Sequence, residues 1–220
     1  VSLIMNRVAE IYSALVSNSP YQQIKNSVLN SLLTEDSKYK ASRQYQEDKI
    51  FWENYLSDFP DVYSLTDKTV KTSNYFLRQS EYLDTKSTKK IQVFSKARDV
   101  LWSDVMIAAT AAYLQRVTGE EDVVLGLPYM RRLGSTLICT PGMVVNVLPL
   151  HLSVKPSMTL LDIANQVSKE IKFIKKHQNY RTENLRRFTN VINSNQRLYG
   201  PIVNIIPFES NLNFEGCQAT

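Results

Sequence analysis

Residues 103–127 read SDVMIAATAAYLQRVTGEEDVVLGL, and this stretch predicts a buried helix followed directly by a buried strand. Apolar side chains occupy almost the whole circumference of the predicted helix, so we expect it to be covered on most sides. Ser103 is the expected N-cap, and Gly119 stands where a left-handed C-cap is favoured. After Asp122, the uninterrupted run VVLGL is typical of a strand that is covered on both faces.

Helices and strands are expected to alternate along the rest of the chain. Thr159 and Asp162 have the spacing of a capping box at the start of one further helix. Apolar periodicity predicts further helices over 1–16, 42–57 and 160–174, and apolar runs predict strands over 143–152 and 202–208. This alternation indicates the mixed α/β class.

The composition of the 220-residue chain is that of a globular protein. Its 43% apolar and 21% charged residues exclude a disordered chain, and its six Gly exclude a collagen-like one. No run approaches the roughly 18 apolar residues of a membrane span. Cys139 and Cys217 are too few for a disulfide framework, and no export signal opens the chain, so we expect a cytoplasmic protein with reduced thiols.

The first residues predict that the chain belongs to a longer polypeptide. An apolar helical stripe is already in progress at Val1, with only Ser2 available as a cap. We therefore expect part of this helix's packing partners to lie upstream.

Familiar catalytic motifs are missing from the sequence. It contains no GxGxxG, Walker A, HExxH or GxSxG pattern. His151 and His177 are its two histidines, which excludes a histidine-rich metal site, and we expect no bound metal.

Basic residues outnumber acidic ones over 165–200. The basic set comprises Lys169, Lys172, Lys175, Lys176, Arg181, Arg186, Arg187 and Arg197, against Glu170 and Glu183. The favoured interpretation is the solvated face of an amphipathic helix. Nucleic-acid binding and attraction to an acidic protein partner remain the alternatives.

Two asparagines lie inside apolar strand patterns. Asn146 stands in VVNVL and Asn204 in IVNII. A buried amide must be hydrogen-bonded or it destabilises the fold. The two amides either point into a shared cavity or form structural hydrogen bonds to neighbouring loops.

Six segments in a fixed order carry a resemblance to a known family. They are YQEDKIFWENYL at 45–56, YLQRVTGEEDVVLG at 113–126, PYMRRLGS at 128–135, PGMVVNVLPL at 141–150, HQNY at 177–180 and YGPIVNI at 199–205. Together they resemble the second half of the condensation domains of nonribosomal peptide synthetases, nearly end to end. The segments MRRLGS, NVLPL and GPIVNI are most similar to those of siderophore synthetases of the enterobactin and bacillibactin kind.

The resemblance implies a fold and a reaction. The fold is a chloramphenicol acetyltransferase-like α/β lobe, a mixed sheet with packed helices, and residues 1–220 form the C-terminal subdomain of a two-lobed condensation domain. The reaction joins an upstream carrier-bound acyl thioester to the amine of a downstream carrier-bound aminoacyl thioester. No cofactor is bound directly, because both substrates arrive on phosphopantetheine arms of carrier proteins.

The implied partners are the N-terminal half of the domain, acidic carrier proteins upstream and downstream, and an adenylation domain in the same polypeptide. Neither nucleic acid nor a membrane is an expected partner. The family's catalytic HHxxxDG motif is absent from this sequence, so the catalytic histidine is expected just upstream and the chain alone is expected to be inactive.

The resemblance also assigns roles to residues of this chain. Arg132 matches the family arginine that forms a structural ion pair with the aspartate of HHxxxDG. Asn204 matches a residue of the substrate tunnel, and Asn146, Gln178 and Tyr180 are expected to shape the same tunnel. The sixth motif departs from the family pattern, because Asn179 stands in place of aspartate.

Three alternative activities remain open. An epimerisation or a heterocyclisation domain shares the superfamily fold, and the residues before Val1 would distinguish them from a condensation domain. A non-catalytic lobe that docks acidic carrier proteins through a basic helix is the third.

Overall fold

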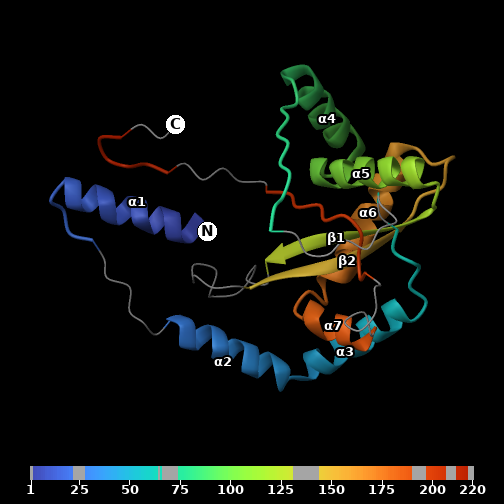
Figure 1. Ribbon diagram of the computed structural model, residues 1–220, viewed down its shortest axis with the longest axis horizontal. Helices are drawn as coiled ribbons and strands as arrows, with labels where there is room; N and C mark the ends of the chain where they lie inside the picture. The colour runs from blue at the N-terminus through green and yellow to red at the C-terminus, as the bar shows by residue number, and fades with distance from the viewer. Residues whose placement is uncertain are drawn as a thin grey trace. The chain divides into compact units, whose positions relative to one another are not determined.

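The computed structural model describes residues 2–21, 28–63, 65, 74–130, 144–189, 197–206 and 212–217. Two strands and seven helices lie in these ranges (Figure 1). The strands are β1 (Asp122–Met130) and β2 (Val145–Ser153). The helices are α1 (Ser2–Val16), α2 (Val28–Lys40), α3 (Arg43–Ser57), α4 (Thr85–Arg98), α5 (Trp102–Thr118), α6 (Leu160–Lys175) and α7 (Thr182–Phe188).

The chain divides into two compact units. The first unit comprises Val1–Glu47, Met130–Val145 and Ile205–Thr220, and the second comprises Asp48–Tyr129 and Asn146–Asn204. In the first unit, α1 is joined to the C-terminal residues. The Tyr12 ring meets Phe214 edge-on at 5.5 Å, and the Glu215 N–H donates to Ser13 Oγ at 2.9 Å.

The second unit contains a two-stranded sheet with β1 beside β2. The strands are antiparallel, since the N–H of Val154, just after β2, donates to the carbonyl of Glu121, just before β1, at 2.7 Å. Five consecutive residues of β1, Val123–Leu127, are buried, which confirms the predicted covering of both faces. In β2, burial of Leu148, Leu150 and Leu152 follows the two-residue period of a strand.

Helix packing in this unit depends on small side chains. Helix α5 packs against α6, and α4 lies against α5 (Figure 1). Ala108 and Ala111 of α5 and Ala164 of α6 are fully buried, and their short side chains permit close approach of the helix backbones. No helix in the described part of the chain is both long and apolar enough to cross a lipid bilayer.

Helix ends follow the sequence signals with one exception. Thr159 and Asp162 form the predicted capping box of α6, and Gly119 adopts φ 79° and donates its N–H to Gln115 O at 2.8 Å, as a left-handed cap requires.

The prediction that Ser103 caps α5 is wrong. Leu101 is the N-cap, and Ser103, inside the first turn, hydrogen-bonds the Asp104 carboxylate instead.

The strand predicted over 202–208 is also wrong in extent. Ile202 forms one isolated parallel bridge with Gly126, and residues 203–206 have no regular structure. Residues 207 and 208 lie outside the described residues. Pro201 has no N–H to donate, which limits how far a ladder can extend at this point.

The cap at Gly119 gives a testable prediction. Gly119→Ala should lower the free energy of unfolding by about 1 kcal/mol, because a Cβ is disfavoured at positive φ. An added Cβ would meet no atom within 4 Å, so the cost is backbone strain alone. Urea unfolding measures the change in the free energy of unfolding. Gly119→Asn is the control, because asparagine tolerates the left-handed region. Equal stability of Gly119→Ala and the parent chain would contradict this account.

Candidate functional site

The segment that carries Asn204 is paired with the free edge of β1. Gly126 N–H donates to Pro201 O, Val203 N–H donates to Gly126 O, and Gly200 N–H donates to Val124 O, each at 2.9 Å. Asn204 follows this paired stretch directly, and its side chain is exposed. The pairing therefore places an exposed amide at the end of a segment that is hydrogen-bonded to the buried strand β1.

Asn146 has a different environment, because its amide is enclosed by the turn between α6 and α7. Its Nδ2 donates to the carbonyls of Gln178 at 3.0 Å and Tyr180 at 2.7 Å. Its Oδ1 accepts the Thr182 N–H at 2.9 Å. The Thr182 hydroxyl lies 2.6 Å from both Asn146 Oδ1 and Val147 O, and donates its single proton to one of them at a time.

These contacts settle how the Asn146 amide is satisfied. It forms structural hydrogen bonds to a neighbouring loop, which is one of the two arrangements that the sequence left open. Its side chain fixes the path of residues 178–182 relative to β2. A contribution of Asn146 to a substrate tunnel would therefore be indirect, through the loop that it holds.

A buried aspartate joins α3 to the end of α6. The Asp48 carboxylate is fully buried, and its Oδ1 lies 2.8 Å from His177 Nδ1. Which atom donates in this contact depends on the tautomer of the imidazole. Trp52 Nε1 donates to the His177 carbonyl at 3.0 Å, and the Phe51 ring stacks on the imidazole at 3.8 Å.

Tyr55 extends this aromatic layer toward β2. Its ring stacks on Phe51 at 5.7 Å, and its hydroxyl accepts the His151 N–H at 3.3 Å. Burial raises the pKa of Tyr55 to about 12, while the hydrogen bond from His151 lowers it. The phenol is therefore neutral over the physiological range and serves as an acceptor for β2.

The other residues predicted for the site differ in burial and in whether the structure describes them. Tyr180 is buried, and Gln178 is half-buried with its Oε1 enclosed and without a hydrogen-bond partner among the described residues. Arg132 lies outside the described residues. The proposed tunnel roles of Asn204, Asn146, Gln178 and Tyr180 stay predictions.

Sequence reasoning did not single out Asp48, Thr182 or Tyr199. A signal for Asp48 exists, because this acidic residue is in phase with buried Trp52 and Leu56 at steps of four along α3. A carboxylate on the apolar face of a helix indicates a buried partner. No comparable local pattern marks Thr182, whose role depends on the approach of β2.

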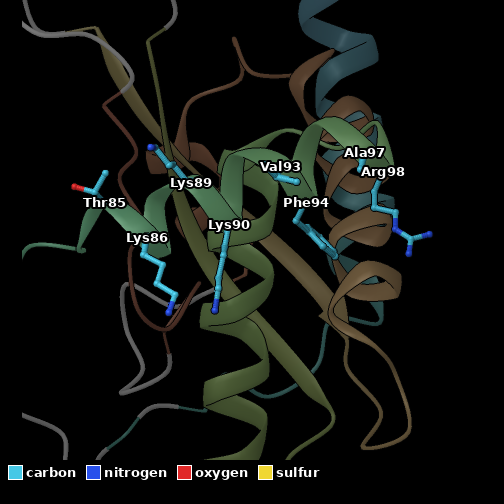
Figure 2. A pocket seen from close by; sticks show the side chains of 8 residues that line it. All are labelled: Thr85, Lys86, Lys89, Lys90, Val93, Phe94, Ala97 and Arg98. Carbon is cyan, nitrogen blue, oxygen red and sulfur yellow. The ribbon is translucent and has the colours of Figure 1, made fainter.

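Helix α4 presents a basic surface. Lys86, Lys89, Lys90, Lys96 and Arg98 lie on it, and the helix contains no acidic residue. A shallow hollow of about 830 Å³ is lined by three of these lysines, Arg98, Val93 and Phe94 among others. Figure 2 shows Lys86, Lys90 and Phe94 projecting to one side of the helix. The surface combines positive charge with an apolar centre.

Among the described residues, no group of three or more His, Cys, Asp or Glu side chains is arranged to hold a metal ion. Both histidines are paired with carboxylates: His151 Nε2 lies 2.7 Å from Asp122 Oδ1, and His177 is bound to Asp48.

The enclosed amide of Asn146 gives a testable prediction. Asn146→Ala should lower the free energy of unfolding by about 3 kcal/mol, because two carbonyls and one N–H lose their partner in a buried place. Asn146→Asp should be destabilised as well, since a carboxylate would face the two carbonyls.

Urea unfolding of these variants measures the loss. Val145→Thr, at the exposed neighbouring position of β2, is the matched control and should stay within about 0.5 kcal/mol of the parent. A loss below about 0.5 kcal/mol for Asn146→Ala would show that the bonds do not hold the turn.

Comparison with known proteins identifies the family. The condensation domain family matches residues 1–216. A dimodular nonribosomal peptide synthase of Bacillus subtilis (strain 168) is 42% identical over 219 residues, which cover 100% of this chain and 9% of that protein. Enterobactin synthase component F of Escherichia coli O157:H7 is 28% identical over 220 residues, with 98% and 17% covered. The likeness to synthetases of the enterobactin kind is thereby confirmed.

Solved structures give the same result. The first condensation domain of the calcium-dependent antibiotic synthetase, in complex with a substrate analogue, has a TM-score of 0.84 at 30% identity and matches 97% of this chain and 49% of its own. A variant of the starter condensation domain of rhizomide synthetase, in complex with C8-CoA and Leu-SNAC, has a TM-score of 0.84 at 36% identity, with 98% and 48% covered.

These structures confirm the expected chloramphenicol acetyltransferase-like α/β fold. The chain spans about half the length of the solved condensation domains and a small part of the synthetases that it matches. By its sequence along residues 1–216 and by its fold, the chain belongs to the condensation domain family of nonribosomal peptide synthetases.

Proposed function

We propose that this chain is the C-terminal lobe of a condensation domain that forms an amide bond between two carrier-bound substrates. Condensation domains of nonribosomal peptide synthetases are acyltransferase-type enzymes. The observation that carries the proposal is the match along residues 1–216, together with structural likeness over nearly the whole chain. We place this reaction in the cytoplasm, on an assembly that also holds an adenylation domain.

The proposed reaction is a simple acyl transfer. The amine of the downstream aminoacyl thioester attacks the carbonyl carbon of the upstream acyl thioester. A C–N bond forms, the C–S bond breaks, and the upstream phosphopantetheine thiol leaves with the proton. Each substrate arrives attached to the arm of its carrier protein, and the amide product stays on the downstream arm, so this lobe needs no bound cofactor of its own.

The proposed roles of residues in this chain rest on the motifs present and on the exposure and position of each side chain. The family's HHxxxDG motif is absent from this sequence, which supports a catalytic histidine contributed by the other half of the domain. The exposed amide of Asn204 is proposed to bind a polar group of the substrate in the tunnel. Gln178 and Tyr180 are proposed to shape the tunnel wall on the loop that Asn146 holds.

Arg132 has a proposed structural role between the halves. Its guanidinium would form an ion pair with the aspartate of the HHxxxDG motif in the other half. A planar guanidinium suits such a pair because it can donate two parallel hydrogen bonds to one carboxylate.

Activity assays test the proposal. The 220-residue chain incubated with an acyl-loaded and an aminoacyl-loaded carrier should yield no amide, whereas the intact domain should yield amide of unchanged amino acid configuration. Turnover by the purified chain would contradict the proposed division of roles. An inverted stereocentre or a heterocycle as the product would identify the alternative activities instead.

The role of Asn204 needs its own variant. In the intact domain, Asn204→Ala should lower kcat by at least about tenfold, in the lower part of the range for lost polar stabilisation of a transition state. Gln79→Ala, an exposed amide before α4, is the matched control and should leave kcat unchanged. An unchanged kcat in Asn204→Ala would remove this residue from the site.

The basic surface of α4 supports a docking role toward an acidic carrier protein. Four of its five basic residues, all but Lys96, line one hollow around Val93 and Phe94. Val93 is 68% exposed, so an apolar contact is available inside the ring of charge. Of the basic residues over 165–200, Lys169, Lys172 and Lys175 are exposed on α6, whereas Arg186 is engaged with Tyr199.

Charge reversal on α4 tests the docking role. The double variant Lys86→Glu/Lys90→Glu should weaken binding of an isolated acidic carrier protein by roughly 10-fold at low salt, and the difference should shrink at high salt. Lys96→Glu is the control for the single variants Lys86→Glu and Lys90→Glu, because each changes the charge equally and Lys96 is on the same helix but does not line the hollow. Titration of labelled carrier measures the Kd. Comparable weakening by Lys96→Glu would show that only net charge matters.

A further inference from the structure

We propose that Tyr199, seated on Gly126 and held by Arg186, is a positioning residue for Asn204. This inference rests on the proposed role of Asn204 in the condensation reaction. The Asn204 amide is exposed and lies outside any helix or strand, so its position must be fixed by neighbouring residues of its segment. Gly126 lies in β1, Arg186 in α7 and Tyr199 in the segment 197–204, and all three residues belong to the second unit.

Gly126 is where the segment approaches β1 most closely. A Cβ added at this glycine would lie 2.7 Å from Tyr199 Cδ2 and 3.1 Å from Ile202 Cγ1. Real side chains do not approach to 2.7 Å, so any residue other than glycine would displace the ring of Tyr199. The same glycine forms two backbone hydrogen bonds with the segment, so the ring and the backbone bonds fix one register together.

Arg186 holds the far end of the Tyr199 ring. Its Nη2 donates to Tyr199 Oη at 3.0 Å, and its Cζ lies 5.9 Å from the ring centroid. The first contact is a charge-assisted hydrogen bond and the second a cation–π contact. Both act on the same ring from α7, so Tyr199 is held between a helix and a strand.

The next residue along the segment restricts it further. A Cβ at Gly200 would lie 2.8 Å from the Tyr63 carbonyl oxygen and 3.0 Å from that of Val124. These are backbone atoms and cannot rotate away. The backbone at residues 199–200 is therefore enclosed on more than one side.

The fixed position of this segment also restricts Asn204. Its peptide nitrogen follows Val203, whose N–H is bonded to Gly126 O at 2.9 Å. Consecutive Cα atoms are about 3.8 Å apart, so a displacement of the paired segment passes directly to the Asn204 side chain. A shift on the order of 1 Å at a substrate-binding group can lower a rate by about 100-fold.

The test measures kcat and KM of the intact condensation domain with loaded carriers, in two backgrounds. Tyr199→Ala and Gly126→Ala are each made in the parent domain and in the Asn204→Ala domain. In the parent background, each should lower kcat by about tenfold, with a smaller change in KM. In the Asn204→Ala background, each should lower kcat by less than about twofold, because the residue through which they act is gone.

Further variants separate positioning from general damage. Adding Tyr199→Ala to Gly126→Ala should cost no further activity, because the clash with the ring is then absent. Tyr199→Phe keeps the ring on Gly126 and should retain most of the activity. Gly119→Ala, which adds backbone strain without a clash, should lower Tm by about 2–4 °C and leave kcat unchanged.

Each outcome has a distinct meaning. Equal losses in both backgrounds, or no loss from Tyr199→Ala, would overturn the positioning role while leaving amide formation intact. An unchanged kcat in Asn204→Ala would overturn it as well, because Tyr199 would then have nothing to position. Absence of amide from the intact parent domain would instead contradict the proposed function. If Gly126→Ala does not fold, Tyr199→Ala and Arg186→Ala in the two backgrounds decide the question.

Discussion

The backbone of β1 is hydrogen-bonded along both edges, and the order of the second unit depends on this constraint. On one edge it pairs with β2, and on the other it receives the segment around Pro201 and Val203. Both faces of the strand are covered as well, so it has no side on which to accommodate a shift. Gly126 makes the second pairing possible, because any Cβ there would meet the ring of Tyr199.

Polar groups in the interior then fix the other elements relative to this sheet. The Asn146 amide holds the turn between α6 and α7 against β2, and the Asp48 carboxylate holds the end of α6 against α3. Both groups are buried, and both have hydrogen-bond partners, as buried polar groups require. They add little apolar area but select one path for the loop that carries Gln178 and Tyr180. The proposed tunnel wall is thus determined by structural hydrogen bonds beneath it.

Local patterns in the sequence were sufficient to predict those helices, strands and caps that depend on residues close together in the chain. The helix and strand over 103–127, the Gly119 cap and the capping box at Thr159 were predicted because periodicity and capping act within a few residues. The strand over 202–208 was overestimated, because an apolar run does not say where a partner strand ends. Ser103 was a plausible cap by residue type, but the N-cap is Leu101, two residues earlier.

The site was predicted in part for the same reason. The resemblance identified the family and pointed to Asn146 and Asn204, but not to the opposite environments of the two amides, one enclosed and one exposed. Those environments depend on which segments meet in three dimensions. Asp48, Thr182 and Tyr199 act across separations of 129, 36 and 13 residues from His177, Asn146 and Arg186, respectively, and no short motif contains both members of any pair.

The central claim is that the segment before Asn204 is part of the folded core through its pairing with β1. Native-state hydrogen exchange of the Gly126, Gly200 and Val203 amides tests it most directly. The account predicts that these three amides exchange slowly and with one common opening free energy, far more slowly than the exposed amide of Leu77. Exchange of Gly200 and Val203 at the rate of Leu77, with Gly126 also unprotected, would contradict it.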